Sequence, residues 1–226
     1  MGQNVTNAYN FQRDAIILMP SVTRYHSTYA QTNLALANSL ALAVEKQGKI
    51  ASDSAEGIQQ AEDRKLITTL IQQSIEQAKV ATALAPENVN AWENLGQTYI
   101  SLMGVAGGAE SWAVASYEKA IQLEPMNPML RVTLGSIHIR QKNYNEALSL
   151  FSGAIALKPD YANGYYNLAN AYRLKGDRER AILAYEQTIQ YTAKYASDLD
   201  KVKTELQSLK NEPASSKESL PPTQKP

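Results

Sequence analysis

Apolar residues recur at three- and four-residue steps along most of the chain, which is the spacing of one face of a helix. The clearest case is a long predicted helix from about Thr23 to Gln47. Its apolar face consists of Tyr29, Leu34, Ala37, Leu40 and Val44. Further helices are predicted over residues 61–85 and 197–211, and the Val-Ile-Thr alternation of strands is missing. The pattern therefore predicts an all-α protein.

Prolines divide this helical pattern into units. The segments Leu84-Ala-Pro86, Leu123-Glu-Pro125 and Leu157-Lys-Pro159 repeat one arrangement. The last two of these prolines are 34 residues apart and the first two are 39 apart, which leaves a five-residue insertion in the glycine-rich stretch 103–109. Because proline cannot continue a helix, each unit is expected to end there and the chain to turn back.

Residues around each proline recur at fixed offsets. Small residues that let two helices approach are Gly96, Gly135, Ala169, Ala147, Ala154 and Ala181, and large residues that fill the space between them are Trp92, Leu95, Tyr99, Tyr117, Phe151 and Tyr172. Over residues 87–191 this pattern closely resembles the tetratricopeptide-repeat (TPR) family, whose period is about 34 residues. The resemblance implies a TPR-type right-handed superhelical solenoid of antiparallel helix pairs.

The first part of the chain matches the pattern less well. Between Pro20 and Pro86 lie two predicted helices that are each longer than a repeat helix, joined by a polar loop over residues 49–60, so one elongated helical hairpin is expected. The expected division is 1–20, a partial or degenerate repeat helix; 21–86, an atypical repeat with extended helices; 87–125, a repeat with the insertion; 126–159 and 160–193, further repeats; 194–211, a capping helix with Ser197 as N-cap; and 212–226, a disordered tail. A start in mid-repeat predicts a fragment of a longer protein, with a degenerate capping helix as the alternative.

Charge and composition narrow the function classes. The formal net charge is zero and there is no cysteine, so nucleic-acid binding, disulfides and thiolate metal sites are not expected. No apolar stretch is long enough to span a membrane, and no signal peptide is recognised. His26 and His138 fall at packing positions of different units, and the 103–109 stretch is interpreted as a flexible loop rather than a phosphate-binding one. We therefore predict no enzyme activity, no cofactor and no metal, and leave the cellular side open between cytoplasmic and extracytoplasmic.

The resemblance to TPR proteins implies that the first helix of each unit lines a concave binding surface. The residues at the corresponding positions are Asn90, Glu93, Gln97, Ile100 and Ser101, then Met129, Val132, Ser136, Ile139 and Arg140, then Asn163, Tyr166, Asn170, Arg173 and Leu174. Amides, a tyrosine and two arginines suit an extended peptide and a carboxylate. Tyr166 and Arg173 are expected to face the groove without contributing to packing. A solvated helix face is the plain alternative.

These features predict a scaffold that binds a protein or peptide through the concave surface. Chaperone-binding TPR domains grip a terminal carboxylate with Lys and Asn at two positions that are Glu93 and Gln97 here, so that subtype is not expected. The alternative hypothesis is an assembly or oligomerisation element. It rests on a looser resemblance to the soluble TPR tail of bacterial membrane proteins of the O-antigen ligase/polymerase type, which process cell-surface polysaccharide.

Overall fold

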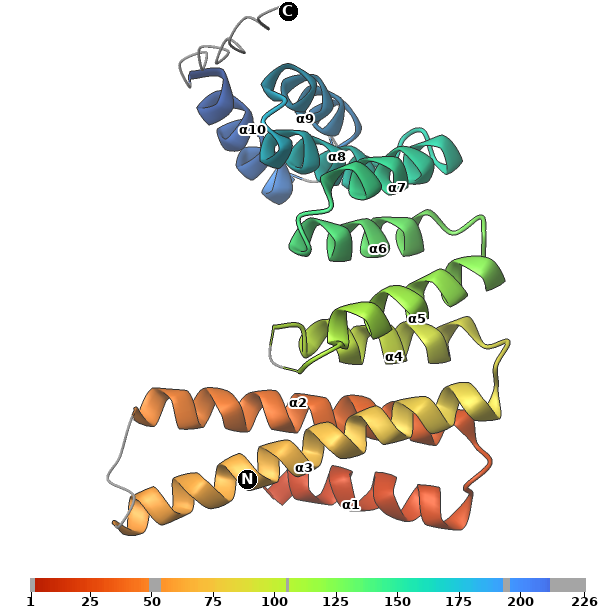
Figure 1. Ribbon diagram of the computed structural model, residues 1–226, viewed down its shortest axis with the longest axis vertical. Helices are drawn as coiled ribbons and strands as arrows, with labels where there is room; N and C mark the ends of the chain where they lie inside the picture. The colour runs from red at the N-terminus through yellow and green to blue at the C-terminus, as the bar shows by residue number, and fades with distance from the viewer. Residues whose placement is uncertain (1–2, 49–53, 105, 193–195, 212–226) are drawn as a thin grey trace, which may run out of the picture.

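The computed structural model describes residues 3–48, 54–104, 106–192 and 196–211. These residues form ten α-helices and no strand, which confirms the predicted all-α fold. In chain order the helices are α1 Gln3–Leu18, α2 Thr23–Gln47, α3 Ala55–Leu84, α4 Val89–Ser101, α5 Ala109–Leu123, α6 Pro128–Arg140, α7 Tyr144–Leu157, α8 Ala162–Lys175, α9 Arg178–Thr192 and α10 Ala196–Asn211. They stack along one axis, from α1–α3 at one end to α8–α10 at the other (Figure 1).

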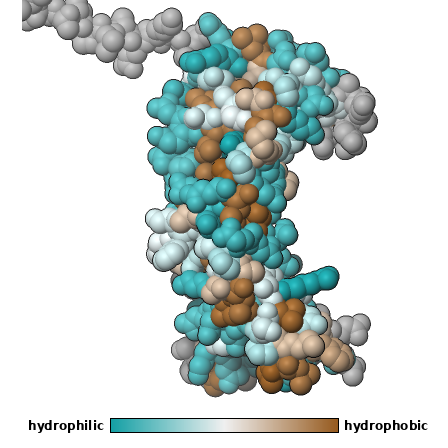
Figure 2. All heavy atoms as spheres, turned by 90° about the vertical axis from the view of Figure 1, so that its right-hand side faces the viewer, coloured by the Kyte–Doolittle hydropathy of each residue, from teal (hydrophilic) through white to brown (hydrophobic). Residues whose placement is uncertain are grey.

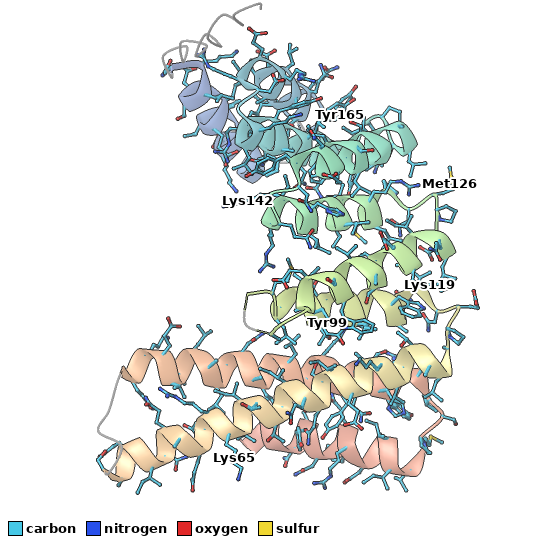
Figure 3. The ribbon with its side chains drawn as sticks, viewed as in Figure 1. Lys65, Tyr99, Lys119, Met126, Lys142 and Tyr165 are labelled. Atoms are coloured by element: carbon cyan, nitrogen blue, oxygen red, sulfur yellow. The ribbon has the colours of Figure 1, made fainter. Side chains whose placement is uncertain are left out.

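Three short antiparallel pairs, α4–α5, α6–α7 and α8–α9, form the repeating part of the solenoid (Figure 1). The turn within a pair, marked by Lys142, and the turn between pairs, marked by Met126, lie on opposite sides of the stack (Figure 3). The first two pairs lie between the prolines at which the predicted units end, and the third follows Pro159. The unit boundaries themselves stay a prediction.

Glycines of the first helices allow the close approach within two of these pairs. A Cβ atom added to Gly96 of α4 would lie 2.6 Å from Cε2 of Tyr117 on α5, and one added to Gly135 of α6 would lie 2.5 Å from Cε1 of Phe151 on α7. Both rings are buried, so their edges rest directly on the glycine backbone. Ala169 takes this place in the third pair and is itself fully buried.

The prolines at which the predicted units end are called junction prolines below. After three of them, the side chain six residues further on forms a hydrogen bond with the carbonyl oxygen of that proline. Trp92 Nε1 donates to Pro86 over 2.8 Å, and Arg131 Nη1 donates to Pro125 over 2.6 Å. Nε2 of the buried His26 lies 2.8 Å from the Pro20 carbonyl oxygen, a contact that requires the Nε2–H tautomer. His26 is therefore a core residue, as predicted, and Trp92 has a hydrogen-bonding role beside its packing role.

The long hairpin of α2 and α3 extends sideways beyond the short pairs (Figure 1). The loop predicted over 49–60 is too long, because α3 already begins at Ala55; residues 49–53 lie outside the described part. Ser54 Oγ accepts a hydrogen bond from the Gly57 N–H at 3.0 Å and so starts the helix as an N-cap. Polar composition misled the prediction here, since a helix at the projecting tip is exposed on most sides and carries few apolar residues.

The insertion between α4 and α5 is more than the plain loop that its glycines indicated. Leu102, Met103 and Ala109 at its two ends are buried in the same core cluster as Tyr99 and Tyr117. Gly104 and Gly108 have φ of 83° and 78°, values that favour glycine. The insertion is therefore anchored on both sides.

The two ends of the solenoid differ in how much apolar surface they expose. At one end α10 lays Val202, Leu206 and Leu209 on the cluster formed by α8 and α9. It begins at Ala196, one residue before the predicted cap Ser197, and the predicted tail 212–226 lies outside the described residues. At the other end Phe11 and Leu18 of α1 are 75% and 80% exposed. None of the helices described is both long and apolar enough to cross a membrane.

Apolar atoms also form a broken band along the side of the stack that carries the turns between pairs (Figure 2). Exposed apolar residues beside the junction prolines are Leu18, Met19, Leu84 and Met126. Because these residues lie in separate turns, the band is discontinuous. The two cavities described below lie elsewhere.

Candidate functional site

A groove of about 440 Å³ runs across the first helices of the three short pairs. Its lining residues come from α4, α6 and α8: Gln97, Ile100, Val132, Thr133, Ser136, Ile137, Arg140, Asn163 and Asn167. Six residues predicted for the concave surface are thus brought together from three separate helices: Gln97, Ile100, Val132, Ser136, Arg140 and Asn163. Successive helices of a stack face the same way, which is why residues at equivalent repeat positions meet.

Hydrogen bonds hold several of these side chains in place. Ser136 Oγ donates to the Val132 carbonyl at 2.9 Å, and Asn167 Nδ2 donates to Asn163 Oδ1, also at 2.9 Å. Arg140 Nη1 donates to the carbonyl of Ile100 on α4 at 3.2 Å, which links two neighbouring pairs. The guanidinium has five N–H donors, so this bond leaves donors for a ligand.

The groove combines an apolar floor with a polar rim. Val132 and Ile137 are 5% and 1% exposed, whereas Gln97, Arg140 and Asn163 are exposed. Amides and hydroxyls can both donate to and accept from a peptide backbone, and Arg140 is the one charged residue among the described residues of the lining. Chemically the surface suits binding of an extended chain by hydrogen bonds and apolar contact.

Sequence reasoning missed three lining residues, Thr133, Ile137 and Asn167. Thr133 and Asn167 follow directly after the predicted Val132 and Tyr166, and Asn167 lies four residues after Asn163, on the same helix face. That spacing was a usable signal for Asn167. Ile137 is almost fully buried, and a floor residue of this kind is indistinguishable from core in a sequence.

Tyr166 is a packing residue, contrary to the prediction that it faces the groove freely. It is half-buried and packs against the core cluster of α8, α9 and α10, with its ring 6.1 Å from that of Tyr185. Its hydroxyl donates to Glu205 Oε1 on α10 at 3.1 Å, and Lys201 Nζ lies 5.5 Å from its ring. The capping helix covers this position, because α10 lies where the first helix of a further pair would be.

Asn170 is likewise engaged inside the protein, while Arg173 on the same helix is exposed. Tyr185 donates its hydroxyl hydrogen to Asn170 Oδ1 at 2.9 Å, and Asn170 Nδ2 donates to the Tyr166 carbonyl at 3.1 Å. Arg173 Nη2 donates to Asn170 Oδ1 over 3.4 Å. Neither Asn170 nor Arg173 lines the groove.

Asn90 and Glu93 lie on α4 but also outside the groove lining. The Asn90 backbone N–H donates to Asn88 Oδ1 at 3.1 Å, which caps the helix. Glu93 is half-buried, and burial together with the neighbouring Glu124 carboxylate raises its pKa. The exclusion of the chaperone-binding subtype stays a prediction.

Among the residues described, no cluster of three or more His, Cys, Asp or Glu side chains is placed to hold a metal ion. His138, at the position of Tyr99 and Tyr172, is half-buried. The groove lining contains no histidine, aspartate or glutamate, so a general acid or base would have to come from elsewhere.

Residues 127–192 match the family model described as "Tetratricopeptide repeat". Among curated proteins, the chain is 28% identical over 98 residues to anaphase-promoting complex subunit 3 of Schizosaccharomyces pombe, covering 43% of this chain and 14% of that protein. It is 33% identical over 95 residues to tetratricopeptide repeat protein 5 of Bos taurus, covering 39% and 22%. The chain thus spans less than a quarter of the length of either relative.

Solved structures share the fold over most of the chain. MamA superposes with a TM-score of 0.61 at 16% identity, covering 85% of this chain and 91% of that one. A thermophilic TPR protein of Thermus thermophilus gives 0.58 at 17% identity, with 91% and 90% covered. These likenesses establish a TPR-type solenoid, including the parts outside the residues that the family model matches.

Proposed function

Since this chain carries tetratricopeptide repeats within a solenoid of TPR fold, we propose that it is a non-catalytic scaffold whose concave groove binds an extended segment of a partner protein. The observation that carries the proposal is the groove itself, in which one apolar floor and one polar rim are assembled from three consecutive pairs. Binding sites are commonly lined by polar residues that converge in a cavity and are not needed for the core.

The chemistry of the rim supports a peptide in extended conformation. Gln97, Ser136 and Asn163 offer donors and acceptors on three successive helices, and a chain laid across these helices presents its own N–H and C=O groups to them. Arg140 lies beside them and pairs best with a carboxylate or a carbonyl oxygen. Glu93 and Asn90, by contrast, belong to the edge of the surface.

The experiment places a photo-crosslinking residue at position 97 in the groove, and a matched one at the exposed position 118 on α5, outside it. We expect position 97 to yield one partner segment and position 118 not to yield it. A synthetic peptide of that segment should then bind the Gln97→Ala, Arg140→Ala double variant at least tenfold more weakly than the parent. A double variant at exposed α5 positions, Glu118→Ala with Gln122→Ala, should bind like the parent. Equal crosslinking from both positions would contradict the proposal.

The alternative of an assembly element in a larger bacterial membrane protein has one observation in its favour. The exposed Phe11, Ile17 and Leu18 of α1 give that end of the solenoid an apolar surface, whereas no large apolar residue among the described side chains of α10 is exposed at the other end. Such a surface favours contact with a further protein segment. Light scattering of the purified chain, with and without Phe11→Ser and Leu18→Ser, tests it: a concentration-dependent mass that both substitutions abolish supports association through α1.

A further inference from the structure

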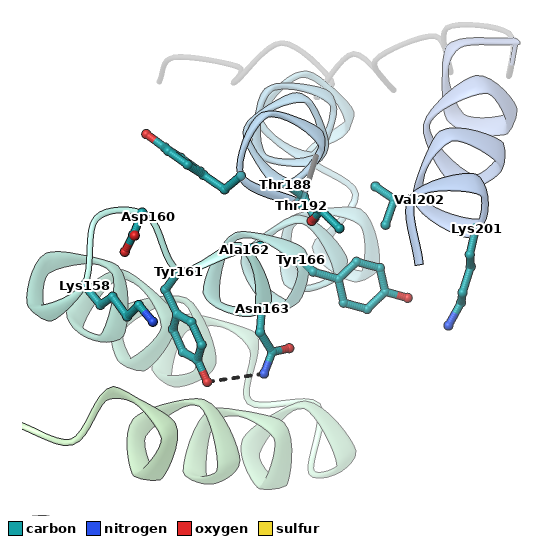
Figure 4. Close-up of a pocket in the computed structure, with 11 residues that line it drawn as sticks. Lys158, Asp160, Tyr161, Ala162, Asn163, Tyr166, Thr188, Thr192, Lys201 and Val202 are labelled. Atoms are coloured by element: carbon teal, nitrogen blue, oxygen red, sulfur yellow. Dashed lines mark hydrogen bonds between the residues drawn. The ribbon is translucent and has the colours of Figure 1, made fainter. Parts of the chain in front are cut away.

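A second cavity, of about 470 Å³, lies at the end of the groove between the last helix pair and α10. Its walls come from the turn before α8 and the first half of α8, from the end of α9 and from the first half of α10 (Figure 4). In Figure 4, Tyr161 and Asn163 lie on one side, Lys201 and Val202 on the other side, and Thr188 and Thr192 above and between them. Its volume lies in the usual range for small-molecule sites, about 300–1,000 Å³.

Two residues that line this cavity differ in type from their equivalents at the earlier junctions. At the earlier junctions Asn88 and Asn127 stand before the first helix and cap it with a side-chain oxygen. Tyr161 stands at that place before α8 and makes no such cap, so its ring lines the cavity instead. Thr188 takes the place of Ala120 and Ala154 and bonds the Ala184 carbonyl at 2.9 Å, which leaves its methyl group for contact.

Aromatic rings and methyl groups provide most of the contact surface in this cavity. Tyr161 and Tyr166 contribute rings, Ala162, Thr188 and Val202 contribute small apolar groups, and Tyr191 lines the cavity with its ring stacked on that of Tyr165 at 5.3 Å. Rings arranged around a cavity favour another ring, because edge-to-face and offset contacts add about 0.5–1.5 kcal/mol to the burial of its area. The lining therefore suits a flat apolar side chain.

The described charged residues around the cavity include both signs. Lys158 and Lys201 are opposed by Asp160 on the rim and by Glu205, whose Oε1 lies 4.0 Å from Lys201 Nζ. Lys158 Nζ lies 5.4 Å from the Tyr161 ring and Lys201 Nζ lies 5.5 Å from the Tyr166 ring, so both ammonium groups rest on the outer aromatic walls. A charged ligand would meet both signs among these described residues and gain little, whereas a neutral one avoids the loss of its hydration.

Asn163 joins the cavity to the groove, since it lines both. Its Nδ2 donates to the Tyr161 hydroxyl at 3.4 Å, and its Oδ1 accepts from Asn167 at 2.9 Å. A peptide that lies along the groove can therefore continue past Asn163 to the cavity. An exposed amide at the entrance is placed to bond that backbone while one side chain enters.

We propose that this cavity is an anchor pocket that takes one neutral aromatic side chain, phenylalanine or tyrosine, of the peptide bound in the groove. The pocket would set the sequence preference of the scaffold at one position, whereas the groove contacts the backbone. The peptide context rests on the function proposed above. The preference for a neutral aromatic group rests on the pocket alone and can be measured without a partner.

The test uses blocked single amino acids as probes of the isotope-labelled full chain by NMR. The probes are N-acetyl-phenylalanine amide, N-acetyl-leucine amide, N-acetyl-glutamate amide and N-acetyl-lysine amide. We expect saturable shifts at the amides of Thr188, Thr192 and Val202 with the phenylalanine probe, at least threefold weaker binding of the leucine probe, and at least tenfold weaker binding of both charged probes. Scattered shifts, or equal binding of a charged probe, would overturn the proposal.

Matched variants locate the binding. Ala162→Leu places an isobutyl group in the cavity and should weaken the phenylalanine probe at least tenfold, while Ala156→Leu, at an exposed position of α7, should leave it unchanged. The second pocket variant is Tyr161→Ala, which removes one wall of the cavity. Unchanged probe binding in both pocket variants would contradict the proposal. The groove variant Gln97→Ala, Arg140→Ala should bind the probe like the parent. Probe binding without any partner segment in the groove would therefore reject the proposed function and leave the pocket standing.

Discussion

The Tyr166 hydroxyl on α8 donates a hydrogen bond to Glu205 Oε1 on α10 at 3.1 Å. This contact ties the last repeat pair to the helix that covers it, and the Tyr166 ring packs against the same core cluster. Tyr166 thus stabilises the closed end of the solenoid. It also forms one wall of the anchor pocket, so stability and binding have to be separated for this residue.

Tyr166→Ala should lower the free energy of unfolding by about 1–3 kcal/mol, because a half-buried ring is lost together with its hydrogen bond. Tyr166→Phe keeps the ring and should cost about 0.5–1.5 kcal/mol. Urea denaturation measures both. Arg173→Ala is the control, since this exposed side chain lies outside both cavities and should change stability by less than about 0.5 kcal/mol. Equal stability of Tyr166→Ala and the parent would show that α10 does not rest on this ring.

Gly135→Ala should destabilise the α6–α7 pair by about 1–3 kcal/mol, because its Cβ would lie 2.5 Å from the buried ring of Phe151. Gly153→Ala in α7 is the matched control. Its Cβ would meet only the Arg131 side chain, at 3.5 Å, so the higher helix propensity of alanine should stabilise the protein by up to about 1 kcal/mol. Thermal unfolding of the two variants should move in opposite directions, and a parallel shift would refute the packing described.

Lys142→Gly should stabilise the protein by up to about 1 kcal/mol. Lys142 has φ of 63° in the turn between α6 and α7, a conformation that costs a residue with a Cβ about 1–2 kcal/mol. Gly176 holds the same turn of the next pair with φ of 85°, which indicates what this turn favours. The gain is reduced by the greater freedom of glycine in the unfolded chain. Chemical denaturation with Lys142→Ala as control, which keeps the strain, distinguishes this effect from loss of the lysine charge.

Alkaline pH should destabilise the protein through Tyr117. Burial, and secondly the Glu93 carboxylate, raise the pKa of its hydroxyl from 10.0 to about 12. Since the folded pKa lies above the unfolded value, this stabilisation is fully present below pH 10 and is lost as pH rises toward 12. Near pH 8, Tyr117→Phe should therefore have nearly the same denaturant midpoint as the parent. Above pH 10 it should lose less stability than the parent. Parallel pH profiles of the two proteins would contradict this.

Removing the projecting part of the hairpin should leave the short pairs folded. Deleting 41–65 and joining the ends by a short turn keeps Ser74, whose Oγ donates to the Ala30 carbonyl at 2.8 Å, and keeps the part of the hairpin near α4. We expect amide resonances of residues 87–192 to remain dispersed and close to their original positions. General collapse of that dispersion would mean that the extension is needed by the whole solenoid.

The helix pairs could be predicted from the sequence, because the residues that pack the two helices of a pair recur at fixed spacings. A glycine that recurs in front of a large ring, as Gly96 and Gly135 do, identifies both partners of a contact. The bounds of α2 coincide with the predicted Thr23–Gln47. The start of α3 was missed because the N-cap Ser54 lies in a run of polar residues that gives no periodic signal.

The groove could be predicted in part and the pocket not at all. Repeat positions transfer from one helix to the next, which correctly brought Gln97, Ser136 and Asn163 together. Tyr166 was misplaced because its environment depends on α10. A signal for α10 was present, since Val202 and Leu206 follow Leu168 and Tyr172 by 34 residues, the spacing expected for the first helix of a further pair. The pocket depends on where the Tyr161 ring turns when no cap forms, and no pattern of residue types specifies that.

The hairpin gives the molecule a lever. At about 1.5 Å per residue, the 30 residues of α3 span roughly 45 Å, more than twice the length of the 13-residue α4 on which the hairpin rests. A rotation of α3 on α4 that moves atoms at their contact only slightly therefore sweeps the tip through a distance several times larger. A load applied at the tip is magnified in the same ratio where it reaches α4, at the near end of the groove. Mechanical force on the hairpin would thus act first on the helix that supplies Gln97.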